Sequence, residues 1–85
     1  MRYGIFAIKD SASQTFAQPF YAPAEQVALR SVRDLVNGSD NVIAKHPSDY
    51  ELFELGSFVD DDGTIVPLDS PRLVARCKDL LVKSN

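Results

Sequence analysis

The chain has 85 residues, with 9 Lys and Arg against 12 Asp and Glu, a formal net charge of −3 and 45% hydrophobic residues. This composition is typical of a globular protein, and the length predicts one domain, residues 1–85, with a small core that a dimer interface would help to stabilise. The single cysteine excludes an internal disulfide framework and a Cys-based zinc site, and no apolar run approaches the roughly 20 residues that cross a bilayer.

Two strands are predicted at the start of the chain. Residues 2–9 are apolar on both faces of a strand, which is typical of a central strand. The same stretch is too short for a secretory signal, which together with the lone cysteine favours a reducing cytoplasm. After a polar turn, residues 15–21 predict a second strand, which either lies at an edge or ends near Pro19, because proline has no N–H to donate.

A helix follows, and it is the clearest element of the sequence. Pro23 suits the first helical turn, and the next residues run to Val36 with Ala28, Val32, Leu35 and Val36 on a predicted core face. Residues 37–38 (Asn-Gly) predict a left-handed helix end.

A second hairpin is predicted after a polar connection. Residues 46–50 (His-Pro-Ser-Asp-Tyr) predict a turn that aims the third strand, residues 51–58. Residues 60–63 (Asp-Asp-Asp-Gly) predict a hairpin tip, because Asp-Gly tolerates positive φ. Residues 64–68 are the expected return strand.

The last segment is expected to be a helix from Pro71 to about Val82. Leu73, Val74, Cys77, Leu80 and Leu81 recur at helical spacing. The alternative is a short strand over residues 73–75 followed by one helical turn.

Strands followed by helices within so few residues predict an α+β fold. We expect a four-stranded, mostly antiparallel sheet with two helices on one face, in the order ββαββα. The other face is expected to carry some of the sheet aromatics, Tyr3, Phe16, Phe20, Phe53 and Phe58.

Candidate reactive residues are few. His46 with Asp49 is a weak general-base candidate, and Cys77 lies on the predicted apolar face, where a cysteine acts as a small hydrophobe. Residues 60–62 lack the ligand spacing of a calcium loop. No phosphate-binding loop or nucleophile elbow is present, so we expect no enzyme, no catalytic residue, no metal and no cofactor.

Basic residues and aromatic rings are the remaining features. An acidic chain is not a typical polyanion binder, but a local basic stripe remains compatible with it. If the last segment is helical, Arg72, Arg76 and Lys83 fall along one such stripe, interrupted by Asp79. A solvated surface is the simpler interpretation of these charges, whereas exposed sheet aromatics would favour stacking of bases. The candidate nucleic-acid-binding residues are Arg30, Arg33, Arg72, Arg76, Lys83, Phe16 and Phe20.

Several short motifs, in this order and spacing, resemble the small nonstructural protein of gokushovirus-type microviruses, phages with single-stranded DNA genomes. They are Gln18-Pro19-Phe20 with Ala22, a helix with Arg30 and Asp34, His46-Pro47-Ser48-Asp49-Tyr50, Leu52, Leu55-Gly56, Phe58, Asp60 and Gly63. The resemblance implies a DNA-binding, non-capsid phage protein of the host bacterial cytoplasm, with no catalytic residues to carry over.

Two functions are therefore expected in order of preference. The first is binding of single-stranded phage DNA during genome replication or packaging, by a homodimer. The alternative is an acidic interaction module that modulates a host or phage replication protein, since its charge suits a basic partner.

Overall fold

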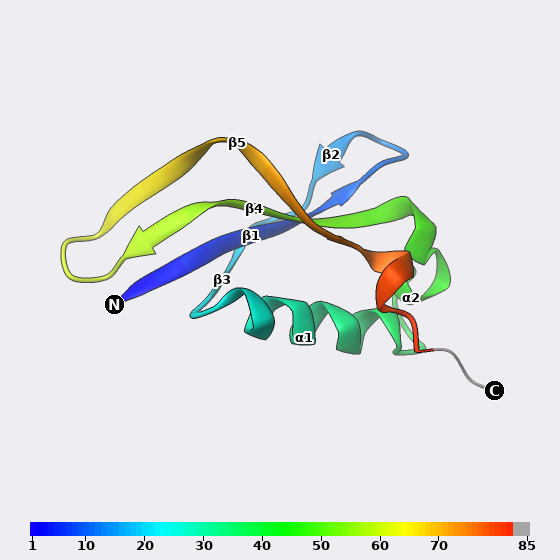
Figure 1. The fold of residues 1–85 in the computed structure, drawn as a ribbon. Coiled ribbons are helices and arrows are strands. Elements are labelled where there is room, and N and C mark those ends of the chain that lie inside the picture. Colours follow the sequence, from blue (N-terminus) through cyan, green and yellow to red (C-terminus); the bar gives the residue numbers. More distant parts are fainter. Residues whose placement is uncertain (83–85) are drawn as a thin grey trace.

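One antiparallel sheet organises the molecule in the computed structural model, which describes residues 1–82. The central strand β1 (Arg2–Asp10) pairs on one side with β4 (Tyr50–Val59), and β4 pairs with the edge strand β5 (Thr64–Arg76) (Figure 1). On its other side β1 pairs with two short strands, β2 (Thr15–Phe16) and β3 (Phe20–Ala22). The predicted α+β class with a mostly antiparallel sheet is confirmed.

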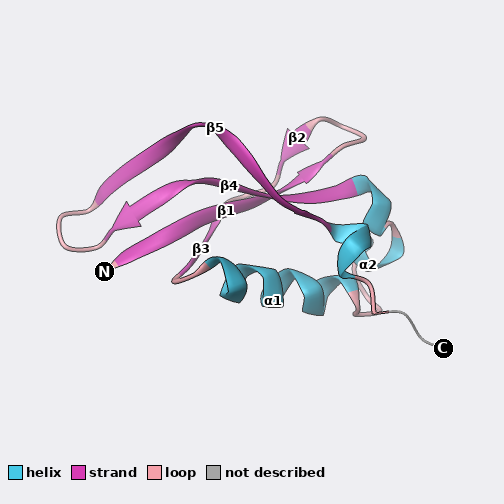
Figure 2. Cartoon of the chain, in the orientation of Figure 1, coloured by secondary structure: helices cyan, strands magenta, loops and turns pink. Residues whose placement is uncertain are grey.

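A single long helix, α1 (Glu25–Val36), runs along one face of this sheet (Figure 2). The one-turn helix α2 (Val42–Lys45) and the 3-10 turns η1 (Pro47–Asp49) and η2 (Cys77–Leu80) gather near its C-terminal end. Within residues 1–82, no helix has the length and apolar character needed to span a membrane.

The core lies between α1 and the sheet. Phe6 and Leu52 are fully buried and belong to the same cluster as the α1 residues Ala28, Val32 and Val36. Side chains alternate along a strand, so Tyr3, Ile5, Ala7 and Lys9 of β1 point away from α1. We call this side of the sheet the far face, and it is the part of the fold that matters most below.

Both ends of α1 differ from the prediction in detail. The helix begins at Glu25 with Ala24 as N-cap, so Pro23 precedes it. It ends at Asn37, whose φ of −95° is not left-handed, and Leu35 is 41% exposed and lies outside the core. The Asn37 side chain replaces the expected left-handed cap by donating to the carbonyl oxygens of Arg33 and Leu80.

The predicted second strand, residues 15–21, is in fact two strands. Both pair with β1, and the Ala17 N–H still donates to the carbonyl oxygen of Ile8 at 2.8 Å, but residues 17–19 are not strand and the pairing is interrupted around Pro19. Proline lacks the N–H that a continuous ladder needs, which explains the interruption.

The predicted C-terminal helix over residues 71–82 is wrong, and the alternative is confirmed. Strand β5 continues to Arg76 and only Cys77–Leu80 is helical, as a 3-10 turn. The partner strand decides this, because Leu73 pairs with Phe53 of β4 and Ala75 pairs with Leu52. The segment thereby gains ladder pairing, whereas an isolated helix of this length is only marginally stable.

The hairpin between β4 and β5 begins as predicted. Gly63 has φ +75° and donates to the carbonyl oxygen of Val59 at 2.9 Å. Farther along, Glu54 pairs with Arg72 whereas Gly56 pairs with Pro67, so residues 68–71 bulge outward opposite Leu55. This bulge, together with two prolines, interrupts the outer edge of the sheet.

Candidate nucleic-acid interface

A row of charged residues crosses the far face near β2. Lys9 of β1 pairs with Glu51 of β4, and Glu51 pairs with Arg76 of β5. The Arg76 Nε lies 3.5 Å from a Glu51 carboxylate oxygen. Glu51 forms an ion pair with Arg76 but none with Lys9, and these three residues together carry a net charge of +1 on an acidic protein.

Two aromatic rings flank this row. Phe16 pairs with Lys9 across the β1–β2 ladder, and its ring meets the ring of Phe53 edge to face with centroids 5.4 Å apart. The Lys9 ammonium lies 5.5 Å from the Phe16 centroid and 5.9 Å from the Phe53 centroid, within cation–π range. We call Lys9, Phe16, Phe53 and Arg76 the basic aromatic cluster.

The cluster leaves aromatic surface accessible. Phe16 is 40% exposed, and it belongs to β2, a strand of only two residues. A half-exposed ring held by an edge contact and a cation has the properties of a platform for a planar ligand. A phosphate placed beside such a ligand would find Lys9 and Arg76 on the same face.

Of the predicted site residues, Arg72 is least available. Its guanidinium donates to Glu25, in the first turn of α1, and to Glu54 of β4, with the Arg72 Nε 2.9 Å from the Glu54 oxygen. These two carboxylates raise the pKa of Arg72. Two carboxylates against one guanidinium make this group net negative.

Arg72 and Arg76 therefore do not share the stripe that a helix would have produced. Arg72 pairs with Glu54 on the α1 side, whereas Arg76 pairs with Glu51 on the far face. A strand reverses its side chains at each residue, and the register shift opposite Leu52 and Phe53 adds one residue between the two arginines.

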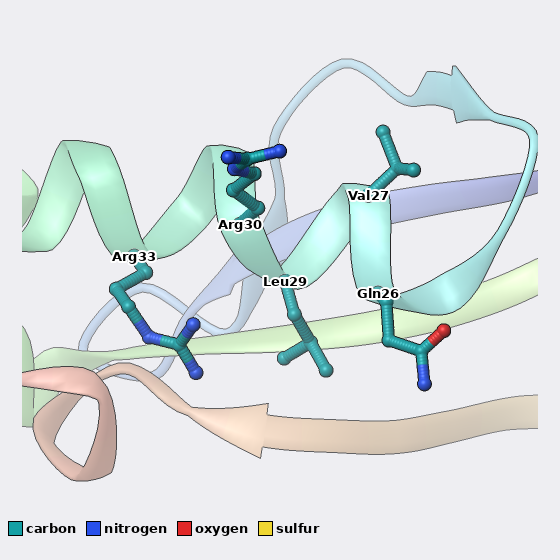
Figure 3. Close-up of a pocket in the computed structure, with 5 residues that line it drawn as sticks. All are labelled: Gln26, Val27, Leu29, Arg30 and Arg33. Atoms are coloured by element: carbon teal, nitrogen blue, oxygen red, sulfur yellow. The ribbon is translucent and has the colours of Figure 1, made fainter.

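Arg30 and Arg33 lie on α1, on the other side of the molecule. They line a shallow surface pocket of about 320 Å³ with Gln26, Val27 and Leu29 (Figure 3). Both are exposed, and neither forms an ion pair with any described residue. They are free cations, but they lie apart from the basic aromatic cluster.

Phe20 is placed differently from the prediction. It is half-buried on the helix-covered face, where its ring stacks on Phe6 at 6.0 Å and packs against the core. Its pairing with Phe6 in the β1–β3 ladder accounts for this orientation. Lys83 lies outside the described residues.

Sequence reasoning missed Lys9 and underrated Phe53. The alternation of side chains along a strand could have identified Lys9, since it places Lys9 on the same face of β1 as Tyr3, Ile5 and Ala7. The pairing of β1 with β2 and β4, which brings Phe16 and Phe53 to Lys9, depends on register and was out of reach.

The other reactive residues have simple structural roles. Cys77 is fully buried in the core, and burial, aided by the nearby Glu51 charge, raises its thiol pKa to about 11. The thiol is therefore protonated near neutral pH, as the core interpretation requires. His46 is exposed and ends α2, where its N–H donates to the carbonyl oxygen of Val42.

Comparison with known proteins identifies a family. Residues 3–80 match the family model described as Phage ORF5 protein, which covers most of the chain. No curated protein and no solved structure matches. The match extends from β1 to the end of η2, which is almost the entire described fold. The chain therefore belongs to the Phage ORF5 protein family.

Proposed function

We propose that this phage protein binds single-stranded DNA of the phage genome during replication or packaging in the host bacterial cytoplasm. The observation that supports it best is the basic aromatic cluster, an exposed Phe16 ring beside Phe53 with Lys9 over both. Resemblance to microviral nonstructural proteins points to the same ligand. The proposal is one of binding without catalysis.

The physical case depends on stacking more than on charge. A base stacked on an aromatic ring contributes about 1–3 kcal/mol and requires no particular sequence. Lys9 and Arg76 would each contact a phosphate beside the stacked base, which offsets the repulsion from a protein of net charge −3. Unpaired bases expose their ring faces, so a single strand fits this cluster better than a duplex.

The two helix arginines extend the proposed interface. Arg30 and Arg33 are exposed cations on α1, and a strand that leaves the far face around the sheet edge would meet them as phosphate contacts. We give them this secondary role because no aromatic ring lines their pocket. Arg72 has its carboxylate partners already and is assigned a structural role.

Fluorescence anisotropy with a labelled oligothymidylate tests the proposal. We expect binding at low salt and micromolar protein, and Phe16→Ala to weaken it about five- to a hundred-fold through lost stacking. Lys9→Ala should reduce the steepness of the log affinity against log salt plot by about 0.7, the contribution of one phosphate contact.

Two matched variants control for general effects. Lys78→Ala removes an exposed cation of η2, and Tyr21→Ala removes an exposed ring at the other end of the sheet. Both should leave DNA affinity within about two-fold of the parent. Absence of binding at low salt, or equal losses in Phe16→Ala and Tyr21→Ala, would contradict the proposal.

The second candidate function is an interaction module for a host or phage replication protein. The favouring observation is that carboxylates hold Arg72 and Arg76 while the hairpin tip exposes acidic residues. A pull-down that recovers a replication protein after nuclease treatment would support it.

We further propose a homodimer, supported by the exposed apolar side chains of β5. Light scattering with and without oligonucleotide measures the mass of the particle.

A further inference from the structure

A second aromatic group lies at the opposite end of the far face. Tyr3 of β1 pairs with Phe58 of β4, with ring centroids 6.5 Å apart, and Tyr21 of β3 lies 5.7 Å from the same Phe58 ring. These three rings and Asp60 line a pocket of about 430 Å³. We call this the tyrosine pocket.

The three rings are more exposed than core packing requires. Tyr21 and Phe58 come from strands on either side of β1, so their rings meet above it and cover Ile5, which is 7% exposed. Tyr21 remains 56% exposed, so contact with Ile5 buries only part of its surface. The pocket therefore offers ring surface that no described residue occupies.

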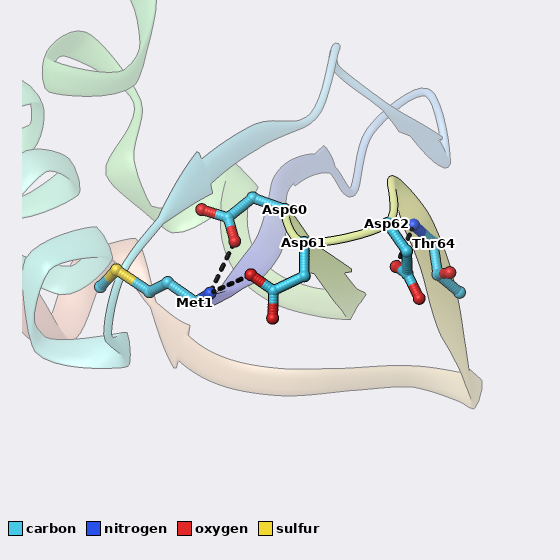
Figure 4. A network of polar contacts seen from close by, with 5 residues as sticks. All are labelled: Met1, Asp60, Asp61, Asp62 and Thr64. Atoms are coloured by element: carbon cyan, nitrogen blue, oxygen red, sulfur yellow. Dashed lines mark hydrogen bonds and ion pairs between the residues drawn. The ribbon is translucent and has the colours of Figure 1, made fainter.

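The charge at the rim is strongly negative. Asp60, Asp61 and Asp62 follow β4 directly, and the Met1 ammonium lies 2.6 Å from Asp60 and 3.5 Å from Asp61 (Figure 4). The hydrogen bond that this ammonium donates to the Asp60 carboxylate raises the pKa of the amine. Asp60, the carboxylate that lines the pocket, is paired with this ammonium, and Asp61 and Asp62 add negative charge at the adjacent hairpin tip, so the three carboxylates and one ammonium are together net negative.

Rings and carboxylates favour the same kind of ligand. The face of an aromatic ring is the negative part of its quadrupole and attracts cations, as a carboxylate does. A phosphate would be repelled by the same rim. Among protein side chains, arginine fits best, because its planar guanidinium stacks on a ring and donates to a carboxylate at its edge.

We propose that the tyrosine pocket binds the guanidinium group of an arginine side chain from a partner protein. This site is distinct from the basic aromatic cluster, and the proposal does not depend on DNA binding. The far face carries cations near β2 and carboxylates near the β4–β5 tip. Its two ends therefore suit ligands of opposite charge.

The test uses a matched pair of peptides on the full chain. The aromatic proton resonances of the protein are followed by NMR while a short glycine peptide with one central arginine is added. The control peptide carries citrulline, which has the same shape without the charge. We expect saturable shifts at Tyr3, Tyr21 and Phe58, and binding of the citrulline peptide about five-fold weaker or more.

Three variants complete the design. Tyr21→Ala and Asp60→Asn should each weaken binding of the arginine peptide about five-fold, and Phe16→Ala should leave it unchanged. Because Tyr21 is largely exposed, its variant should retain the parent's amide spectrum outside the pocket, which separates lost binding from unfolding. Equal binding of both peptides, absence of shifts, or shifts of these resonances by an oligothymidylate instead would overturn the proposal.

Discussion

A single side chain, Asn37, joins the end of α1 to the end of the described chain. Its Nδ2 donates to the carbonyl oxygens of Arg33 at 2.8 Å and Leu80 at 2.9 Å, and its Oδ1 accepts from the Val82 N–H at 2.8 Å. The residue thus replaces the expected left-handed cap with a tertiary contact. Its hydrogen bonds with Leu80 and Val82 add to the packing of Cys77 and Leu80 in the core cluster that also contains the buried face of α1.

Asn37→Ala is therefore expected to lower the free energy of unfolding by about 1–3 kcal/mol, because it leaves helix-end and η2 carbonyl groups without this donor. Urea denaturation followed by circular dichroism measures the change. Ser31→Ala, on the exposed surface of α1, is the matched control and should change stability by less than about 0.5 kcal/mol. Equal effects of both substitutions would contradict the assigned role.

Burial of Cys77 makes a prediction about pH. Its thiol pKa is about 11 in the folded protein against the ordinary value of 9.0, so the folded state holds the proton over this range while the unfolded state releases it. Stability should therefore fall as pH rises from about 9 to about 11, and Cys77 should contribute no such slope below pH 8.

The measurement compares urea midpoints at pH 8 and pH 10.5 for the parent and for Cys77→Ala. The variant is less stable throughout, because it leaves a cavity in the core, but it should lose less stability on the change to high pH. All other titratable groups are the same in both proteins and so cancel in the comparison. Identical pH dependence in the two proteins would contradict the assignment.

At the scale of elements, Gly56 allows β4 and β5 to come together at the bulge. A Cβ added there would lie 2.4 Å from the Val66 carbonyl oxygen and 2.9 Å from the Pro67 Cα, both backbone atoms. Such distances are shorter than van der Waals contact, so one strand would have to move.

Gly56→Ala should accordingly cost about 1–3 kcal/mol of stability and increase hydrogen exchange across the β4–β5 ladder. Ser57→Ala, the next residue of the same strand, is the control, since it removes only a hydroxyl group that makes no hydrogen bond with a described residue. If Gly56→Ala were as stable as the control, the close approach of the strands would be relaxed in solution.

At the scale of the whole molecule, the two aromatic groups of the far face should act independently. Tyr3 and Lys9 lie six residues apart in β1, which corresponds to about 20 Å along a strand. Phe16→Ala should reduce oligonucleotide affinity and leave arginine binding intact, whereas Tyr21→Ala should have the opposite pattern. The double variant should show the sum of both effects within about 0.5 kcal/mol in each assay.

Anisotropy and NMR titrations on the same four proteins provide this comparison. Loss of both activities in each single variant would show that the far face responds as one unit. In that case the separation of charge along the sheet would not separate the ligands.

How much of this was predictable follows from the range of the interactions involved. Helix α1 and the hairpin tip at Gly63 were predicted closely, because helical periodicity and the Asp-Gly turn depend on neighbours in the chain. The His46–Tyr50 turn was also predicted, and η1 occupies it. These elements are determined by local preferences.

The segment over residues 73–81 differs from the prediction. Residues 73–81 have helical spacing, and yet the segment is strand as far as Arg76, because β4 supplies a ladder for it, and only Cys77–Leu80 form a 3-10 turn. Local pattern and tertiary pairing disagreed, and pairing with a ten-residue strand prevailed. The predicted arginine stripe disappeared with the helix.

The amino-acid sequence by itself determined the fold class, the position of α1, the hairpin tip and the supply of rings and charges. Only the tertiary structure decided which rings meet which charges, bringing Lys9 to Phe16 and Phe53 and giving Arg72 to Glu25 and Glu54. The reason is physical. Side-chain periodicity depends on neighbours in the chain, whereas strand register depends on partners far away, and a shift of one residue moves a side chain to the opposite face.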